Sequence, residues 1–185
     1  HARRPAVLAA VLAAVCGLAA LALALHYPLL PAVMSALVLV GGVAFFAQPV
    51  LWLLLLPALL PLFGLAPWTG WISFEEQDLL LLTAAAGAYA RMVWDGRSRR
   101  ARDTAGAGAP PAWLWGPLVV LFAVVTVVSM FRGFADAGGF QFGWFQGYHE
   151  PMNSVRLAKS WLAAVLMLPL WLAACRANSE QASRW

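Results

Sequence analysis

Six long apolar segments, separated by short polar stretches or by turn residues, dominate the pattern of hydrophobic and polar positions along the chain. The segments are continuous rather than alternating, which favours helices over the strands of an outer-membrane barrel. The segments expected to cross a membrane are residues 6–26, 31–47, 49–64, 78–94, 113–131 and 156–175. The pattern therefore predicts an all-α polytopic membrane protein with about six transmembrane helices.

The second and third segments form one apolar stretch that only Gln48 and Pro49 interrupt. A single helix over residues 31–64 would be about 50 Å long, whereas the hydrocarbon core of a bilayer is about 30 Å thick. We therefore expect the chain to fold back near Gln48 and Pro49. Pro57 and Pro61 are expected to make the third helix short, and kinked or unwound near its far end.

The composition supports the same class of protein. Hydrophobic residues make up 63% of the 185 residues and charged residues 11%, and the mean hydropathy is +0.77. Soluble domains have about 45–50% apolar residues, so the composition excludes an ordinary soluble protein. The first apolar stretch is longer than the core of a signal peptide, which has roughly 7–15 residues, so we expect an uncleaved span there.

Neither cysteine is placed for a disulfide or a metal site. Cys16 and Cys175 lie inside apolar segments near opposite ends of the chain, with no CxxC pair and no nearby histidine cluster. We expect both to be buried, inert thiols. Since the GxxxxGK[ST] phosphate loop and the HExxH zinc motif do not occur either, no cofactor and no metal are predicted.

The positive charges predict the orientation of the spans. With six spans, most of the arginines fall on one side of the membrane, namely Arg3, Arg4, Arg91, Arg97, Arg99, Arg100, Arg102, Arg176 and Arg184. By the positive-inside rule this side is cytoplasmic, so both termini are expected in the cytoplasm. The cations left on the exterior side are Arg132, Arg156 and Lys159.

The same topology assigns the loops. Residues 95–111, DGRSRRARDTAGAGAPP, are expected to form a flexible cytoplasmic loop, and residues 65–77 and 132–153 to form exterior loops. Arginines beside a span are typical of topology determinants or of contacts to anionic lipid, and the pI near 9.7 has the same explanation. We therefore expect membrane lipids, and not nucleic acid, as partners.

The first candidate for chemistry is the exterior loop that leads into the fourth span. Ser73 and Glu76 fit an S-x-x-E capping box, and the carboxylates of Glu75, Glu76 and Asp78 suit the positive end of a helix dipole. These acids therefore have a structural explanation. The alternative is that they bind a cation, a sugar hydroxyl or a catalytic group from elsewhere.

The second candidate is the aromatic segment of residues 129–151, in which phenylalanine, tryptophan and tyrosine alternate with glycines. Such rings suit a segment that lies in the membrane interface, although they could also stack on sugar faces. His149 is the one histidine in this segment. A single histidine is not enough to identify a general base, so that role is kept as an alternative for His149.

The third candidate is the pair Arg156 and Lys159, which lie three residues apart at the expected start of the sixth span. Asn153 or Ser154 could cap this helix, whose positive end and exterior position both disfavour cations. A phosphate or pyrophosphate would remove the conflict. The alternatives are snorkelling to lipid phosphates and ion pairs with acids such as Glu150 or Asp136.

Two stretches, LAPWTGWISFEEQDLLLLTAAAGAY and YHEPMNSVRLAKSWLAAVLMLPL, resemble the N-terminal half of bacterial O-antigen ligase and polymerase-like membrane proteins. In that family an exterior loop with tryptophan runs into an acidic helix start, and a PLNxxRxxKG segment opens a later span. The positions that match this segment are Pro151, Asn153, Arg156 and Lys159. Met152 and Ser160 depart from it.

The resemblance implies a multi-span glycosyltransferase of the bacterial inner membrane. Such an enzyme moves a glycan from an undecaprenyl pyrophosphate carrier to an acceptor at the periplasmic face, without a nucleotide sugar or an essential metal. Family members are longer, and their periplasmic loop with a functional histidine follows the matched region. Because that loop has no counterpart here, His149 is not given its role and the catalytic residues stay unknown.

Three classes of function remain open from the sequence. The chain is expected to be an N-terminal fragment of such a glycan-transferring enzyme, or a shorter relative that lacks the active centre. A non-enzymatic subunit that scaffolds a larger membrane complex is the main alternative. A transporter is disfavoured because no span has a central charged residue of the kind that marks an ion pathway.

Overall fold

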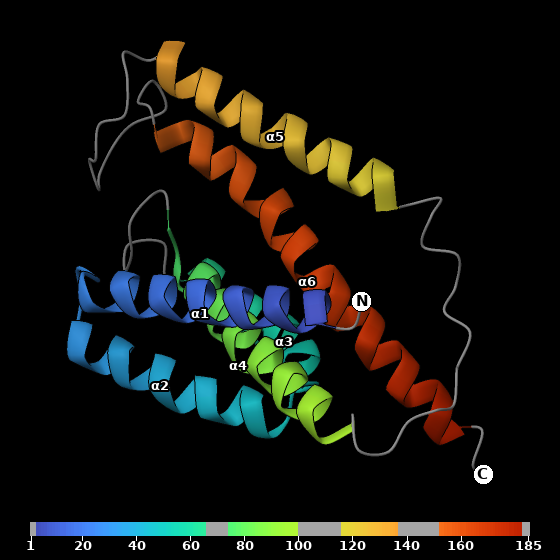
Figure 1. The fold of residues 1–185 in the computed structure, drawn as a ribbon. Helices are drawn as coiled ribbons and strands as arrows, with labels where there is room; N and C mark the ends of the chain where they lie inside the picture. Colours follow the sequence, from blue (N-terminus) through green and yellow to red (C-terminus); the bar gives the residue numbers. More distant parts are fainter. Residues whose placement is uncertain (1–2, 66–73, 100–115, 137–151, 183–185) are drawn as a thin grey trace.

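The computed structural model describes residues 3–65, 74–99, 116–136 and 152–182, and these residues fold into six helices (Figure 1). The helices are α1 (Arg3–Leu25), α2 (Pro31–Ala47), α3 (Trp52–Leu65), α4 (Glu76–Arg99), α5 (Gly116–Asp136) and α6 (Met152–Ala182). The all-α class and the helical character of the six predicted segments are confirmed. By length and composition three helices could cross a membrane, over Ala6–Leu25, Val119–Asp136 and Ser154–Cys175, while α2 is a shorter apolar helix.

The central helix is α4, which packs against α1, α2, α3 and α6. Leu79, near the start of α4, clusters with Ala24, near the end of α1, whereas Ala86 faces Gly17 further back in α1. These two helices are therefore antiparallel. In contrast, α2 runs parallel to α4. Gly41 of α2 lies against Thr83 of α4, and four residues further along each helix Phe45 lies against Gly87.

The last two helices form a hairpin beside this bundle (Figure 1). The ring of Phe122 in α5 packs edge-on against Trp161 in α6, with 4.5 Å between the centroids, and Gly133 lies next to Ser154. The two helices are therefore antiparallel. Since α5 packs mainly on α6, most of its apolar side chains are exposed on the surface of the chain.

Small residues let the first, second and fourth helices approach closely. Ala20, Ala84 and Ala85 have no exposed surface. A Cβ atom added to Gly87 of α4 would lie 2.7 Å from the carbonyl oxygen of Gly42 and 2.7 Å from the Cβ of Phe45, both in α2. The backbones of α2 and α4 are thus in direct contact, as small residues permit in tightly packed membrane helices.

A hydrogen bond joins α4 to α6 at a proline. Pro169 lies inside α6, where it supplies no N–H group to the carbonyl four residues earlier. The hydroxyl of Tyr89 donates a 2.6 Å hydrogen bond to the carbonyl of Leu166 in the same turn. Tyr89 of α4 therefore supplies a hydrogen-bond donor to the turn of α6 in which Pro169 lacks its N–H group.

The fourth and fifth helices extend beyond the predicted spans. Residues 95–99, predicted to belong to the flexible loop 95–111, continue α4, because Arg91 Nε donates to Asp95 Oδ1 at 2.9 Å and supports another turn. Similarly, Arg132 and Asp136 were expected in the exterior loop 132–153 but lie in the last turns of α5. The loop boundaries at residues 95 and 132 were therefore wrong.

The start of α6 and the course of α3 also differ from expectation. Asn153 and Ser154 lie inside α6, which begins at Met152, so the prediction that one of them caps the helix is wrong. The third helix is short, with 14 residues, as predicted, but it continues through Pro57 and Pro61 to Leu65 and does not unwind. The two prolines are four residues apart, so the N–H groups they lack lie on one face of the helix.

The two cysteines differ in their surroundings. Cys16 is buried among the small residues that join α1 to α4, as expected. Cys175 lies on an exposed face of α6, so the prediction that both thiols are buried was wrong for this one. An apolar segment only predicts that a residue lies in a span, and not whether it faces a neighbouring helix or the surroundings.

Candidate functional site

The first turn of α4 is closed by its own acidic residues. Glu75 precedes the helix, and its backbone N–H donates a 2.8 Å hydrogen bond to Asp78 Oδ2 three residues later. This is the backward half of a capping box, with Asp78 in the position usually held by glutamate or glutamine. The predicted Ser73–Glu76 box is wrong in register, because it requires Glu76 at the third position of the helix, whereas Glu76 is the first residue of α4. Ser73 itself lies outside the described residues.

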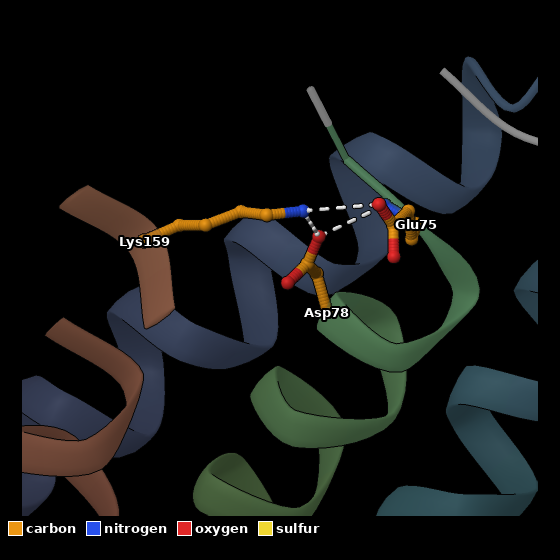
Figure 2. A network of polar contacts seen from close by, with 3 residues as sticks. All are labelled: Glu75, Asp78 and Lys159. Carbon is orange, nitrogen blue, oxygen red and sulfur yellow. Dashed lines mark hydrogen bonds and ion pairs between the residues drawn. The ribbon is translucent and has the colours of Figure 1, made fainter. Parts of the chain in front are cut away.

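Lys159 of α6 reaches across to this acidic turn (Figure 2). Its Nζ lies 2.7 Å from Asp78 Oδ2 and 3.8 Å from Glu75 Oε1. The side chains of Lys159 and Asp78 are each only 16% exposed, whereas that of Glu75 is 55% exposed. Lys159 and Asp78 therefore form a tight, mostly buried ion pair, and Glu75 adds a weaker contact at the edge.

This pair changes the interpretation of the two cations. Counted from Met152, Arg156 and Lys159 are the fifth and eighth residues of α6. The effect of a helix dipole is confined to the first turn, so the conflict with the positive helix end is small. The partner of Lys159 is Asp78, a residue of another helix that was not among the acids considered from the sequence; of those, Glu150 lies outside the described residues.

A cavity of about 480 Å³ lies between α3, α4 and α6, and we call it the charged cavity. The side chains that line its charged end are Glu75, Asp78, Arg156 and Lys159, from the beginnings of α4 and α6. The other lining residues are Gln77 and Ser160 together with Trp52, Leu56, Leu81, Ala163, Ala164 and Met167. The cavity thus has a charged end and an apolar wall, so it can hold an amphipathic molecule.

The other predicted site residues do not join this cavity. Glu76 lines a separate, mostly apolar cavity of about 250 Å³ between α2, α3 and α4. Arg132 is exposed on α5, and His149 lies outside the described residues. Seven residues were predicted for the anion site, with Arg156 and Lys159 as its cations and Arg132, His149, Glu75, Glu76 and Asp78 as possible support. The structure brings four of them together and places Glu76 and Arg132 elsewhere, and His149 is the one that it does not describe.

Trp52, Leu56 and Met167 were not predicted as site residues. They form part of the apolar wall, yet in the sequence they are ordinary members of apolar segments. No pattern of spacing or charge distinguishes them from side chains that face lipid. Within the described part of the chain, no three histidine, cysteine, aspartate or glutamate residues are grouped as metal ligands.

Comparison of the chain with protein-family models, with curated proteins and with solved structures finds no match. The residues of the charged cavity and the arrangement of the helices around it are therefore the basis on which a function can be inferred.

Proposed function

We propose that this chain is the membrane portion of a glycan-transferring enzyme of the O-antigen ligase and polymerase-like kind, and that it binds the phosphate-bearing head of a polyprenyl-linked glycan. The charged cavity is the observation that carries the proposal. Arg156 and Lys159 supply cations at one end, and Leu56, Leu81 and Met167 supply apolar surface. A polyprenyl pyrophosphate has the same two parts, an anionic head and an isoprenoid tail.

The glycan-transfer part of the proposal depends on the family resemblance of two stretches, residues 65–89 and 148–170. They contain the start of α4 and the start of α6, which are far apart in the sequence. The two starts contribute all four charged side chains of the charged cavity. The two stretches that resemble the family therefore form the charged end of the cavity together, which supports a shared role for them.

We further propose that all six helices cross the bacterial inner membrane, with both termini in the cytoplasm and the charged cavity opening to the periplasmic face. The directions of the helices support this topology. Along the chain, α2, α4 and α6 run parallel to one another, while α1 is antiparallel to α4 and α5 is antiparallel to α6. The directions of these five helices are those that six successive crossings require.

Cysteine labelling tests this topology. In a variant without Cys16 and Cys175, a cysteine at position 99 should be protected from an impermeant thiol reagent in intact spheroplasts, whereas one at position 141 should react. The physical reason is that the arginine-rich loop stays on the cytoplasmic side. Lysis before labelling is the control, since both positions should then react. Labelling at 99 but not at 141 in intact spheroplasts would reverse the proposed orientation.

Binding of an undecaprenyl pyrophosphate analogue tests the functional proposal. We expect Arg156→Lys to weaken binding by about tenfold, because a guanidinium forms two parallel hydrogen bonds to a phosphate whereas an ammonium acts as a point charge. Arg132→Lys is the matched control, since Arg132 lies at the end of α5 outside the charged cavity. Equal affinity of Arg156→Lys and the parent protein would show that the cavity is not the carrier site.

A second candidate function is that of an accessory subunit, and the exposed surface of α5 favours it. The large apolar side chains that α5 leaves more than half exposed include Val120, Leu121, Phe122, Val124, Val125, Val128 and Phe131. Lipid can cover this surface, but so can a helix of a partner subunit. A protein that binds no phosphate-bearing lipid, and that crosslinks through α5 to one defined membrane partner, would fit this function.

A further inference from the structure

We propose that the charged cavity selects a lipid headgroup that has both a phosphate and a primary ammonium group, with Glu75 as the residue that binds the ammonium. This inference rests on the proposed function, in which the cavity binds a phosphate-bearing lipid. It adds the second charge of the ligand and the residue that recognises it.

The balance of charges in the cavity carries the inference. Two cations, Arg156 and Lys159, and two carboxylates, those of Glu75 and Asp78, line the same end. A ligand with negative charge alone would meet attraction from the cations and repulsion from the carboxylates. A headgroup with both charges can place an opposite charge beside each group, so we expect it to bind more tightly than a headgroup that has a phosphate alone.

The contacts of the two carboxylates differ. Lys159 and Asp78 neutralise each other at 2.7 Å, and the same Oδ2 atom of Asp78 also accepts the backbone N–H of Glu75, so the charge of this carboxylate is already balanced within the protein. Glu75 lies 3.8 Å from Lys159, which is longer than a hydrogen bond. Its side chain is 55% exposed, so its oxygens can accept hydrogen bonds from a ligand that enters the cavity.

The placement of Arg156 suits the other half of such a headgroup. Arg156 is one helical turn before Lys159 on the same face of α6, and it lines the same cavity as Glu75. A phosphate at the guanidinium and an ammonium at the carboxylate would therefore lie at neighbouring positions. Two kinds of lipid carry this pair of groups, namely aminophospholipids and phosphate-linked lipids whose sugar has a free amine.

Native mass spectrometry of the purified full chain in detergent can test the inference with matched lipid pairs. The first pair is phosphatidylethanolamine and phosphatidylglycerol, and the second is undecaprenyl phosphate linked to glucosamine or to N-acetylglucosamine. We expect the amine-bearing member of one pair to be retained about threefold to tenfold more than its partner, because its ammonium forms a charge-assisted hydrogen bond. The pair that shows the preference identifies the source of the headgroup.

Glu75→Gln is the informative variant. It should bring the retention ratio close to one, because the amide has no charge, while the backbone N–H of residue 75 still bonds Asp78 and keeps the start of α4 intact. Asp136→Asn is the matched control, since this exposed acid lies at the end of α5 outside the cavity, and its ratio should equal that of the parent protein.

The outcomes separate this inference from the functional proposal. Diacylglycerol, which has no phosphate, gives the baseline for retention. If no phosphate-bearing lipid exceeds that baseline, the functional proposal fails and this inference fails with it. If phosphate-bearing lipids exceed it but neither pair shows a preference for the amine, or if Glu75→Gln keeps the preference, only the ammonium site is excluded.

Discussion

We expect Gly87→Ala to lower the free energy of unfolding by about 1–3 kcal/mol, because the added methyl group overpacks a contact between two backbones. The nearest atoms to the new carbon would be the Gly42 carbonyl oxygen and the Phe45 Cβ, both at 2.7 Å, and the Phe46 nitrogen at 2.9 Å. None of these is the end of a flexible side chain. The helices α2 and α4 must therefore move apart, which loosens the packing on the central helix of the fold.

Gly42→Ala is the matched control for this substitution. A Cβ added to Gly42 meets nothing within 4 Å, although the same residue provides the carbonyl that blocks Gly87. Alanine in an open helical position stabilises by about 0.5–1 kcal/mol relative to glycine, so Gly42→Ala should unfold at the same or a higher temperature. Thermal unfolding of both variants in one detergent measures the difference. Equal stability of Gly87→Ala and the parent would mean that the backbones of α2 and α4 are further apart than these distances of 2.7–2.9 Å imply.

The helices were predictable because each depends on local sequence. Long apolar runs favour helices wherever a chain meets lipid, and the interruption at Gln48 and Pro49 is where α2 ends and a turn leads to α3. The ends were less predictable, because they depend on single side-chain contacts. Asp95 belongs to a polar stretch that resembles a loop, yet its pairing with Arg91 favours another turn of α4.

The candidate site was only half predictable. Arg156 and Lys159 attracted attention because two cations begin an apolar run, and Glu75 and Asp78 because acids gather before another. Their meeting could not be predicted, since Asp78 and Lys159 are 81 positions apart and come together only because α4 and α6 are parallel neighbours. The apolar wall of the cavity depends on the same arrangement, which no single segment encodes.

The ion pair between Asp78 and Lys159 is expected to behave as a unit. We expect Asp78→Asn to destabilise the protein by about 2–4 kcal/mol, because it leaves the ammonium of Lys159 in a mostly buried site without its closest partner. Asparagine can still accept the N–H of Glu75, so the start of α4 should remain and the loss should come from the charge. Lys159→Met keeps the length of the side chain. It should destabilise the protein by a similar amount, because it leaves the carboxylate of Asp78 without its ammonium partner.

The double variant distinguishes an ion pair from two independent losses. Asp78→Asn combined with Lys159→Met leaves no uncompensated charge, so we expect its loss of stability to be smaller than the sum of the two single losses, by about 1–3 kcal/mol of coupling. Glu75→Gln serves as the control, because this 55% exposed carboxylate at 3.8 Å should change stability by less than about 1 kcal/mol. Unfolding of all four variants in the same detergent gives the cycle. Additive losses in the double variant would mean that Lys159 and Asp78 do not stabilise each other, and other contacts, such as the Tyr89 hydrogen bond, would then hold α6 against α4.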